Sequence, residues 1–176
     1  MKKAIMNCLL ILTAFTIQNC VFPLLPFLSA SPNLLLILTF SFGFMNGRMT
    51  GMLYGILCGI LLDLFYSGPF CFYTLFYIYV GYLNGWFAKY YYEDYITLPL
   101  ILSISNELAY NIYVYIFRFL IRGRLHFFYY LKEIIIPETI CTAVVTLFIY
   151  RLLLFLNHRL AEIENRRESS IAKRPD

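Results

Sequence analysis

Polar side chains that could do chemistry recur at helical spacing inside one apolar stretch of the chain. Ser103, Glu107 and Asn111 lie four residues apart, so they share one face of a predicted helix. Lipid cannot satisfy such groups, so this face must meet other helices or a wet cavity. Three uses stay open: a hydrogen-bond network that fixes a helix bundle, a pocket for a ligand or ion, and a docking face for a partner.

A second pattern consists of glycines that end at an acid. Gly51, Gly55, Gly59 and Asp63 follow one another at four-residue intervals. A smooth glycine face lets another helix backbone approach closely, which drives helix association inside lipid. An acid at the end of such a face either serves a partner or the fold, or it reaches water or caps a helix end. The pattern predicts helix packing or a partner interface.

Signatures of catalysis and metal binding are missing from the sequence. There is no H-E-x-x-H, G-x-S-x-G or phosphate-binding loop, and the acids fall on different apolar stretches. His126 and His158 are isolated, and no two of the five cysteines form a C-x-x-C pair. We therefore expect no enzyme activity, no catalytic residue, no cofactor and no metal site.

The composition places these patterns in a membrane. Of 176 residues, 61% are apolar and only 14% are charged, and the mean hydropathy is +0.70. A soluble domain of this size could not hide so much apolar surface, because most of its surface faces water. The net charge of +4 is scattered between apolar stretches. This distribution is typical of membrane topology and not of nucleic-acid binding.

The apolar stretches predict an all-α, polytopic protein with six transmembrane helices. The length and continuity of these stretches argue against strands, because barrel strands are short and alternating. Residues 1–156 are expected to form the transmembrane domain, and residues 157–176 a charged cytoplasmic tail. The predicted spans are about 4–22, 33–47, 50–66, 70–92, 95–117 and 134–156.

Basic residues predict the orientation of these spans. Ten of the 14 fall on the side of the two termini when the chain crosses six times, which places both termini in the cytoplasm. The other four are crowded into one outer connection. They either pair with nearby acids or meet an external partner. These residues are Arg118, Arg122, Arg124 and Lys132.

Several of these motifs together resemble the MreD family. Pro32 and Asn33 precede the second apolar run, where the family often has Pro-Asp or Pro-Asn. The glycine series that ends in Asp63-Leu64 resembles the family's G-x3-G-x3-G-x3-D-L signature, and Tyr79-x-Gly81 has the expected spacing. Cys71 and Phe72 stand where the family often has a second glycine. The specific part of the resemblance covers about residues 31–85.

The resemblance implies a non-enzymatic scaffold in the inner membrane of a bacterium. Members of this family work with MreC, a single-span protein with an external domain. They help to couple MreB filaments to RodA and a class B penicillin-binding protein, which build peptidoglycan. The family is also similar in helix arrangement to the substrate-binding subunits of vitamin transporters. Self-association of the chain is compatible with this role.

A small-molecule binder is the alternative from a different class. A vitamin-binding subunit of a membrane transporter would account for the polar stripe around Glu107 and for the many aromatic residues. Such a protein would hold a ligand that raises its melting temperature by mass action.

Overall fold

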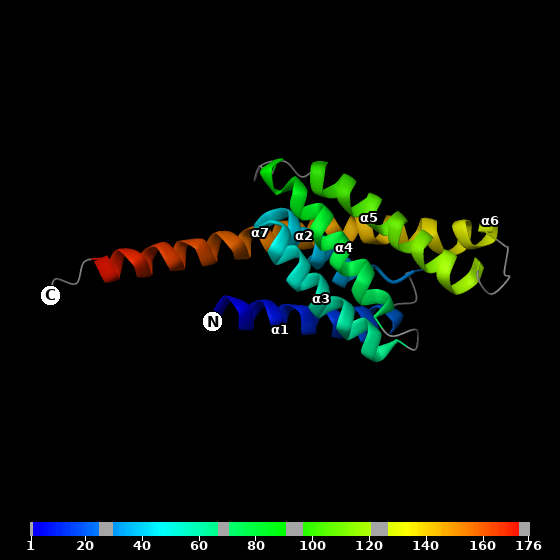
Figure 1. The fold of residues 1–176 in the computed structure, drawn as a ribbon, viewed down its shortest axis with the longest axis horizontal. Helices are drawn as coiled ribbons and strands as arrows, with labels where there is room; N and C mark the ends of the chain where they lie inside the picture. Colours follow the sequence, from blue (N-terminus) through cyan, green and yellow to red (C-terminus); the bar gives the residue numbers. More distant parts are fainter. Residues whose placement is uncertain (1, 25–29, 67–70, 91–96, 121–126, 173–176) are drawn as a thin grey trace.

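The computed structural model describes residues 2–24, 30–66, 71–90, 97–120 and 127–172, and these form helices without a strand (Figure 1). The N-terminal helix α1 (Lys2–Thr16) continues into a π-helical and a 3₁₀ turn. Short π- or 3₁₀-helical segments also follow α4 and α5 and precede α7. The remaining elements are η1 (Ile17–Val21), η2 (Phe22–Leu24), α2 (Leu34–Asn46), α3 (Arg48–Phe65), α4 (Phe72–Trp86), η3 (Phe87–Tyr90), α5 (Thr97–Tyr115), η4 (Ile116–Leu120), α6 (Phe127–Tyr130), η5 (Leu131–Ile135) and α7 (Ile136–Ala172).

The all-α membrane fold class is confirmed. In the described part of the chain, four helical segments are long and apolar enough to cross a membrane: Asn7–Leu24, Arg48–Phe65, Thr97–Arg118 and Leu131–Phe155. The other two predicted spans correspond to α2, with 13 residues, and α4, with 15 residues. The helix α2 is shorter than the roughly 20 residues that a bilayer requires of a helix, whereas α4 continues into η3 and is not among the four segments. The number of six spans therefore stays a prediction.

The helix α2 is the centre of the bundle. Every residue from Leu34 to Phe44 is buried, and α2 packs against α1, α3, α4, α5 and α7. A helix that is apolar on nearly all sides suits either lipid or the core of a bundle, and here other helices enclose it. Because its neighbours surround it, α2 can be shorter than the bilayer is thick.

A tight turn joins α2 to α3. Gly47 is the single residue between the two helices, and its φ of 90° lies in a region that favours glycine. Its N–H donates to the Gly43 carbonyl at 2.9 Å, which closes the end of α2. This turn places α2 and α3 side by side, and α4 packs against both.

The helices α5 and α7 form the other half of the bundle. They pack against each other, and each also contacts α2. The C-terminal part of α7, drawn in orange to red in Figure 1, extends beyond the other helices. The helix runs to Ala172 and so through most of the predicted tail, and the domain boundary at residue 156 stays a prediction.

Candidate functional site

The glycine face of α3 lies against the backbone of α4. A Cβ atom added at Gly55 would overlap the Tyr77 carbonyl, and one added at Gly59 would overlap the backbone of Thr74. Gly51 faces Gly81 of α4, and a Cβ on either glycine would overlap the other's carbonyl oxygen. In this fold, the face predicted for helix packing or a partner is therefore occupied by another helix of the same chain.

Asp63 caps the start of α4 from the end of α3. Its carboxylate accepts hydrogen bonds from the backbone N–H groups of Tyr73 at 2.9 Å and Thr74 at 3.0 Å. The Thr74 hydroxyl donates to the same carboxylate at 2.5 Å. The first N–H groups of a helix have no partner within the helix, so an acid at this point satisfies them. Asp63 thus fixes the position of α4 relative to α3.

Cys71 precedes α4 and adopts a left-handed backbone conformation, with φ of 65° and ψ of 11°. Residues other than glycine rarely adopt this conformation. The resemblance described above predicts a second glycine at Cys71 or Phe72. The backbone conformation of Cys71 is one that favours glycine, and the side chain of Cys71 does not cap the helix that follows.

Asn33 joins three elements at the start of α2. Its side-chain oxygen accepts hydrogen bonds from the Leu36 N–H at 3.2 Å and the Tyr77 hydroxyl at 2.9 Å. Its backbone N–H donates to the Thr142 hydroxyl at 3.2 Å. Pro32 precedes it, and the Pro32 carbonyl accepts from the Leu34 N–H at 3.1 Å. The Pro-Asn pair therefore ties α2 to α4 and α7.

The polar stripe of α5 is buried in the structure. Ser103, Glu107 and Asn111 are each exposed by 1% or less. The Ser103 hydroxyl lies 2.7 Å from that of Thr146 on α7. The Asn111 side-chain amide donates to the Glu107 carboxylate at 3.3 Å and to the Glu107 backbone carbonyl at 3.2 Å. Among the described residues, the second Glu107 carboxylate oxygen (Oε2) has no hydrogen-bond partner.

A pair of asparagines links α5 to α4. Asn84 and Asn106 exchange two hydrogen bonds of 3.0 Å through their side-chain amides. The amide of Asn84 also donates to the Val80 carbonyl of its own helix at 2.8 Å. The sequence pattern gives no sign of this pairing, because a lone Asn84 shows no partner until the two helices are placed side by side.

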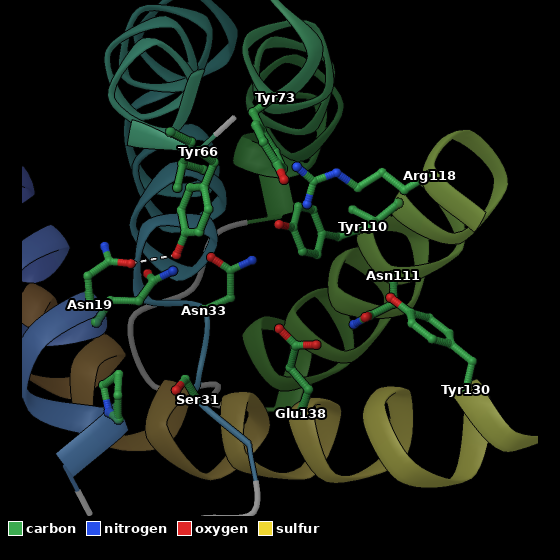
Figure 2. A pocket seen from close by; sticks show the side chains of 14 residues that line it. Asn19, Ser31, Asn33, Tyr66, Tyr73, Tyr110, Asn111, Arg118, Tyr130 and Glu138 are labelled. Atoms are coloured by element: carbon green, nitrogen blue, oxygen red, sulfur yellow. Dashed lines mark hydrogen bonds between the residues drawn. The ribbon is translucent and has the colours of Figure 1, made fainter. Parts of the chain in front are cut away.

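A polar cavity of about 260 Å³ lies where several helix ends meet (Figure 2). Amides, phenols, one carboxyl group and one guanidinium group line it. Of the predicted site residues, only Asn33 and Asn111 are in its wall. The lining residues are Gln18, Asn19, Pro23, Ser31, Asn33, Leu62, Tyr66, Tyr73, Tyr110, Asn111, Val114, Arg118, Tyr130 and Glu138.

Hydrogen bonds and ring contacts position the cavity wall. The Tyr66 hydroxyl donates to the Asn19 side-chain oxygen at 2.5 Å, and the guanidinium carbon of Arg118 lies 5.8 Å from the centre of the Tyr73 ring. Burial raises the pKa of Tyr66, and it raises the pKa of Tyr130 to about 12. These two phenols therefore stay neutral near pH 7 and can donate hydrogen bonds.

Glu138 lines the cavity, although its position in the sequence indicates a different role. Its position next to Pro137 indicates a cap at the start of a span, and it does lie in the first turn of α7. However, η5 leads directly into α7, so the helical backbone begins before this turn. Figure 2 shows the Glu138 carboxyl group pointing into the cavity.

The four outer basic residues fall into different surroundings. Arg118 is half-buried and lines the cavity, whereas Lys132 is exposed on η5. Arg122 and Arg124 lie outside the described residues. Within the described part of the chain, no group of three or more His, Cys, Asp or Glu side chains is placed to hold a metal ion.

Comparisons with known proteins identify the family of the chain. Neither the curated proteins nor the solved structures gave a match, so the expected likeness to vitamin-transporter subunits in helix arrangement stays a prediction. The family model described as "rod shape-determining protein MreD" matches residues 2–159 of the 176-residue chain. The match covers the described helices as far as residue 159 of α7 and every residue that lines the cavity. The chain belongs to the MreD family and has a role in determining rod shape.

Proposed function

We propose that the chain is a non-enzymatic scaffold subunit of the cell-elongation machinery. The observation that carries this proposal is the family match over residues 2–159. The fold is compatible with it, because the described part of the chain is a helix bundle whose outer surface is apolar. In this role the protein binds MreC and helps to couple MreB filaments to RodA and a class B penicillin-binding protein. It lies in the bacterial inner membrane with both termini in the cytoplasm.

Gly51, Gly55, Gly59 and Asp63 serve in this proposal to hold α4 in place. Their face is covered by α4, so the span of MreC contacts another face of the bundle. Exposed apolar residues occur on the outer side of α3, such as Leu57, and on α5, such as Ile112. A second copy of the chain could use the same kind of surface.

Crosslinking in cells tests the proposed contact with MreC. Single cysteines replace Leu57, Ile112 or Phe148, an exposed residue of α7, in a chain whose five native cysteines have been changed to serine or alanine. We expect one of these faces to crosslink to MreC and a cysteine at the buried Ser103 to give no adduct. Failure of cysteines along all the exposed helix faces to reach MreC, in a stable and inserted chain, would contradict the proposal.

A vitamin-binding transporter subunit remains the second candidate, since the polar cavity is the kind of feature it requires. Membership of the MreD family favours the scaffold. The neighbouring genes discriminate between the two: homologues of MreB and MreC support the scaffold, and transporter ATPase subunits support the alternative.

A further inference from the structure

The polar cavity is larger than helix packing requires. A water molecule takes roughly 30 Å³ in the liquid, so about 260 Å³ has room for several waters or for one small organic molecule. Helix bundles in lipid are otherwise held by close packing, which leaves no such space. The cavity is therefore a candidate binding site.

Opposite charges stand on two sides of this cavity. Figure 2 shows the Glu138 carboxyl group on one side and the Arg118 guanidinium group on the other, next to Tyr73 and Tyr110. A carboxylate next to tyrosine rings suits an ammonium group, which is attracted to the charge and to the ring faces. A guanidinium group suits a phosphate or carboxylate, to which it can donate two parallel hydrogen bonds.

Several polar groups of the wall have capacity for a ligand. The side-chain oxygen of Asn33 already accepts two hydrogen bonds, from Leu36 and Tyr77, which leaves its amide N–H groups as the donors near the cavity. Asn111 donates its amide to Glu107, which leaves its side-chain oxygen to accept. A ligand with both donors and acceptors would match this wall.

One acid lines the cavity, and a second lies behind its wall. Glu138 lines the cavity, and the fully buried Glu107 lies behind Asn111 with Oε2 unpaired in the described part of the chain. Asp63, by contrast, is satisfied by the backbone of α4. A positive group in the cavity would pair with Glu138, whereas a purely anionic ligand would find its charged partner in Arg118 alone.

From this geometry we propose that the cavity binds a small zwitterion, with its ammonium group against Glu138 and its phosphate or carboxylate against Arg118. The headgroup of an aminophospholipid and a free amino phosphate or amino acid share this chemistry. The proposal concerns a ligand of the bundle and does not depend on which proteins the scaffold holds.

The first test measures the melting temperature of the purified full-length protein in detergent with O-phosphoethanolamine as the probe. Ethanolamine and inorganic phosphate each carry one half of its charge and serve as comparisons. We expect a saturable rise in melting temperature with the zwitterion that exceeds the rise with either half alone. A rise with inorganic phosphate that equals the rise with the zwitterion would overturn the ammonium site.

Matched variants locate the two charged contacts. Glu138→Gln and Arg118→Gln each remove one of them, while Glu133→Gln and Lys132→Gln make the same charge changes at exposed positions of η5. We expect the first two to weaken binding by about tenfold or more, which corresponds to roughly 1.4 kcal/mol, and the controls to bind like the wild type. If Glu138→Gln is too unstable to melt cooperatively, native mass spectrometry measures probe bound to the folded fraction. Wild-type affinity in Glu138→Gln would overturn the proposal.

Lipid nanodiscs distinguish the two sources of the ligand. The protein is reconstituted with phosphatidylethanolamine or phosphatidylglycerol, released and weighed by native mass spectrometry. Retention of phosphatidylethanolamine by the wild type and its loss in Glu138→Gln would identify a lipid headgroup. Binding of the soluble probe without lipid retention would identify a free zwitterion. If the protein neither retains phosphatidylethanolamine nor binds the probe, the proposal is wrong, even where crosslinking to MreC succeeds.

Discussion

The two halves of the bundle are held together in opposite ways. Between α3 and α4, glycines bring two backbones into contact, and the acid of this region, Asp63, has its partners on the backbone of α4. Between α5 and α7, side chains such as Ser103 and Thr146 bridge the gap, and the acid Glu107 keeps an unpaired oxygen among the described residues. The polar cavity is lined by residues of both halves, but its two charged groups, Arg118 and Glu138, belong to the second.

This difference shows what each kind of helix contact permits. Backbone contact tolerates no added atom, so the α3–α4 half has one arrangement available to it. Hydrogen bonds between side chains tolerate changes of size more easily and leave room for water or a ligand. The α3–α4 half is therefore suited to carry the fold, and the α5–α7 half is suited to respond to what binds.

The largest loss of stability is expected from Gly59→Leu. The new side chain would meet the backbone of Thr74, which cannot move without displacing α4, so we expect a loss of about 3 kcal/mol or more. Thermal unfolding in detergent measures it, with Leu53→Phe on the exposed side of the same helix as the control. If Gly59→Leu has the same melting temperature as the wild type, the two halves do not differ in their tolerance of added side-chain volume. If such a protein is also recovered with MreC unchanged, the glycine face lies outside the interface.

An intermediate effect is expected from Asp63→Ala. The change removes a charged acceptor from two backbone N–H groups and one hydroxyl, which we expect to cost about 2 kcal/mol. Asp63→Asn keeps an acceptor at the same position and should recover part of the loss. Chemical or thermal unfolding of the three proteins gives the ranking, and equal stability of the alanine variant and the wild type would contradict the capping role.

The smallest effect is expected from Glu107→Leu. The substitution removes the hydrogen bond from Asn111, but it also removes the unpaired carboxylate oxygen. We therefore expect the free energy of unfolding to fall by about 1 kcal/mol. Glu107→Gln, which can still accept from Asn111, is the control. Thermal unfolding in detergent checks both, and an unchanged melting temperature for the leucine variant would argue against a buried network.

The positions of the helices could be predicted because apolar runs and their breaks are local properties. The predicted span 33–47 corresponds to α2 (Leu34–Asn46), and 50–66 to α3 (Arg48–Phe65). Gly47 marks the turn between them in the sequence and in the structure. The predicted connection around Lys132 is less accurate. Its charged residues indicate a break between two spans, whereas η5 carries Lys132 and Glu133 as exposed residues of a helical segment that leads into α7.

The cavity could not be predicted, because its wall depends on which helix ends meet. Gln18, Asn33, Tyr66 and Glu138 come from different elements, and none of them follows a periodic pattern with the others. The polar stripe of α5 was visible because Ser103, Glu107 and Asn111 repeat along one helix. The contact of Ser103 with Thr146 could not be predicted, because a threonine in an apolar helix more commonly bonds to the backbone of its own helix. Here the Thr146 hydroxyl bonds both to Ser103 and to the Thr142 carbonyl of its own helix.

The enclosed start of α2 has a consequence for how the protein is made. The N–H of Asn33 finds its acceptor on Thr142, which the ribosome adds 109 residues later. Until α7 has been synthesised and inserted, that donor must stay hydrated or pair elsewhere, because lipid offers it nothing. The central helix is thus completed only after the last one arrives. A nascent chain truncated before Thr142 would lack the acceptor for this N–H at the start of its innermost helix.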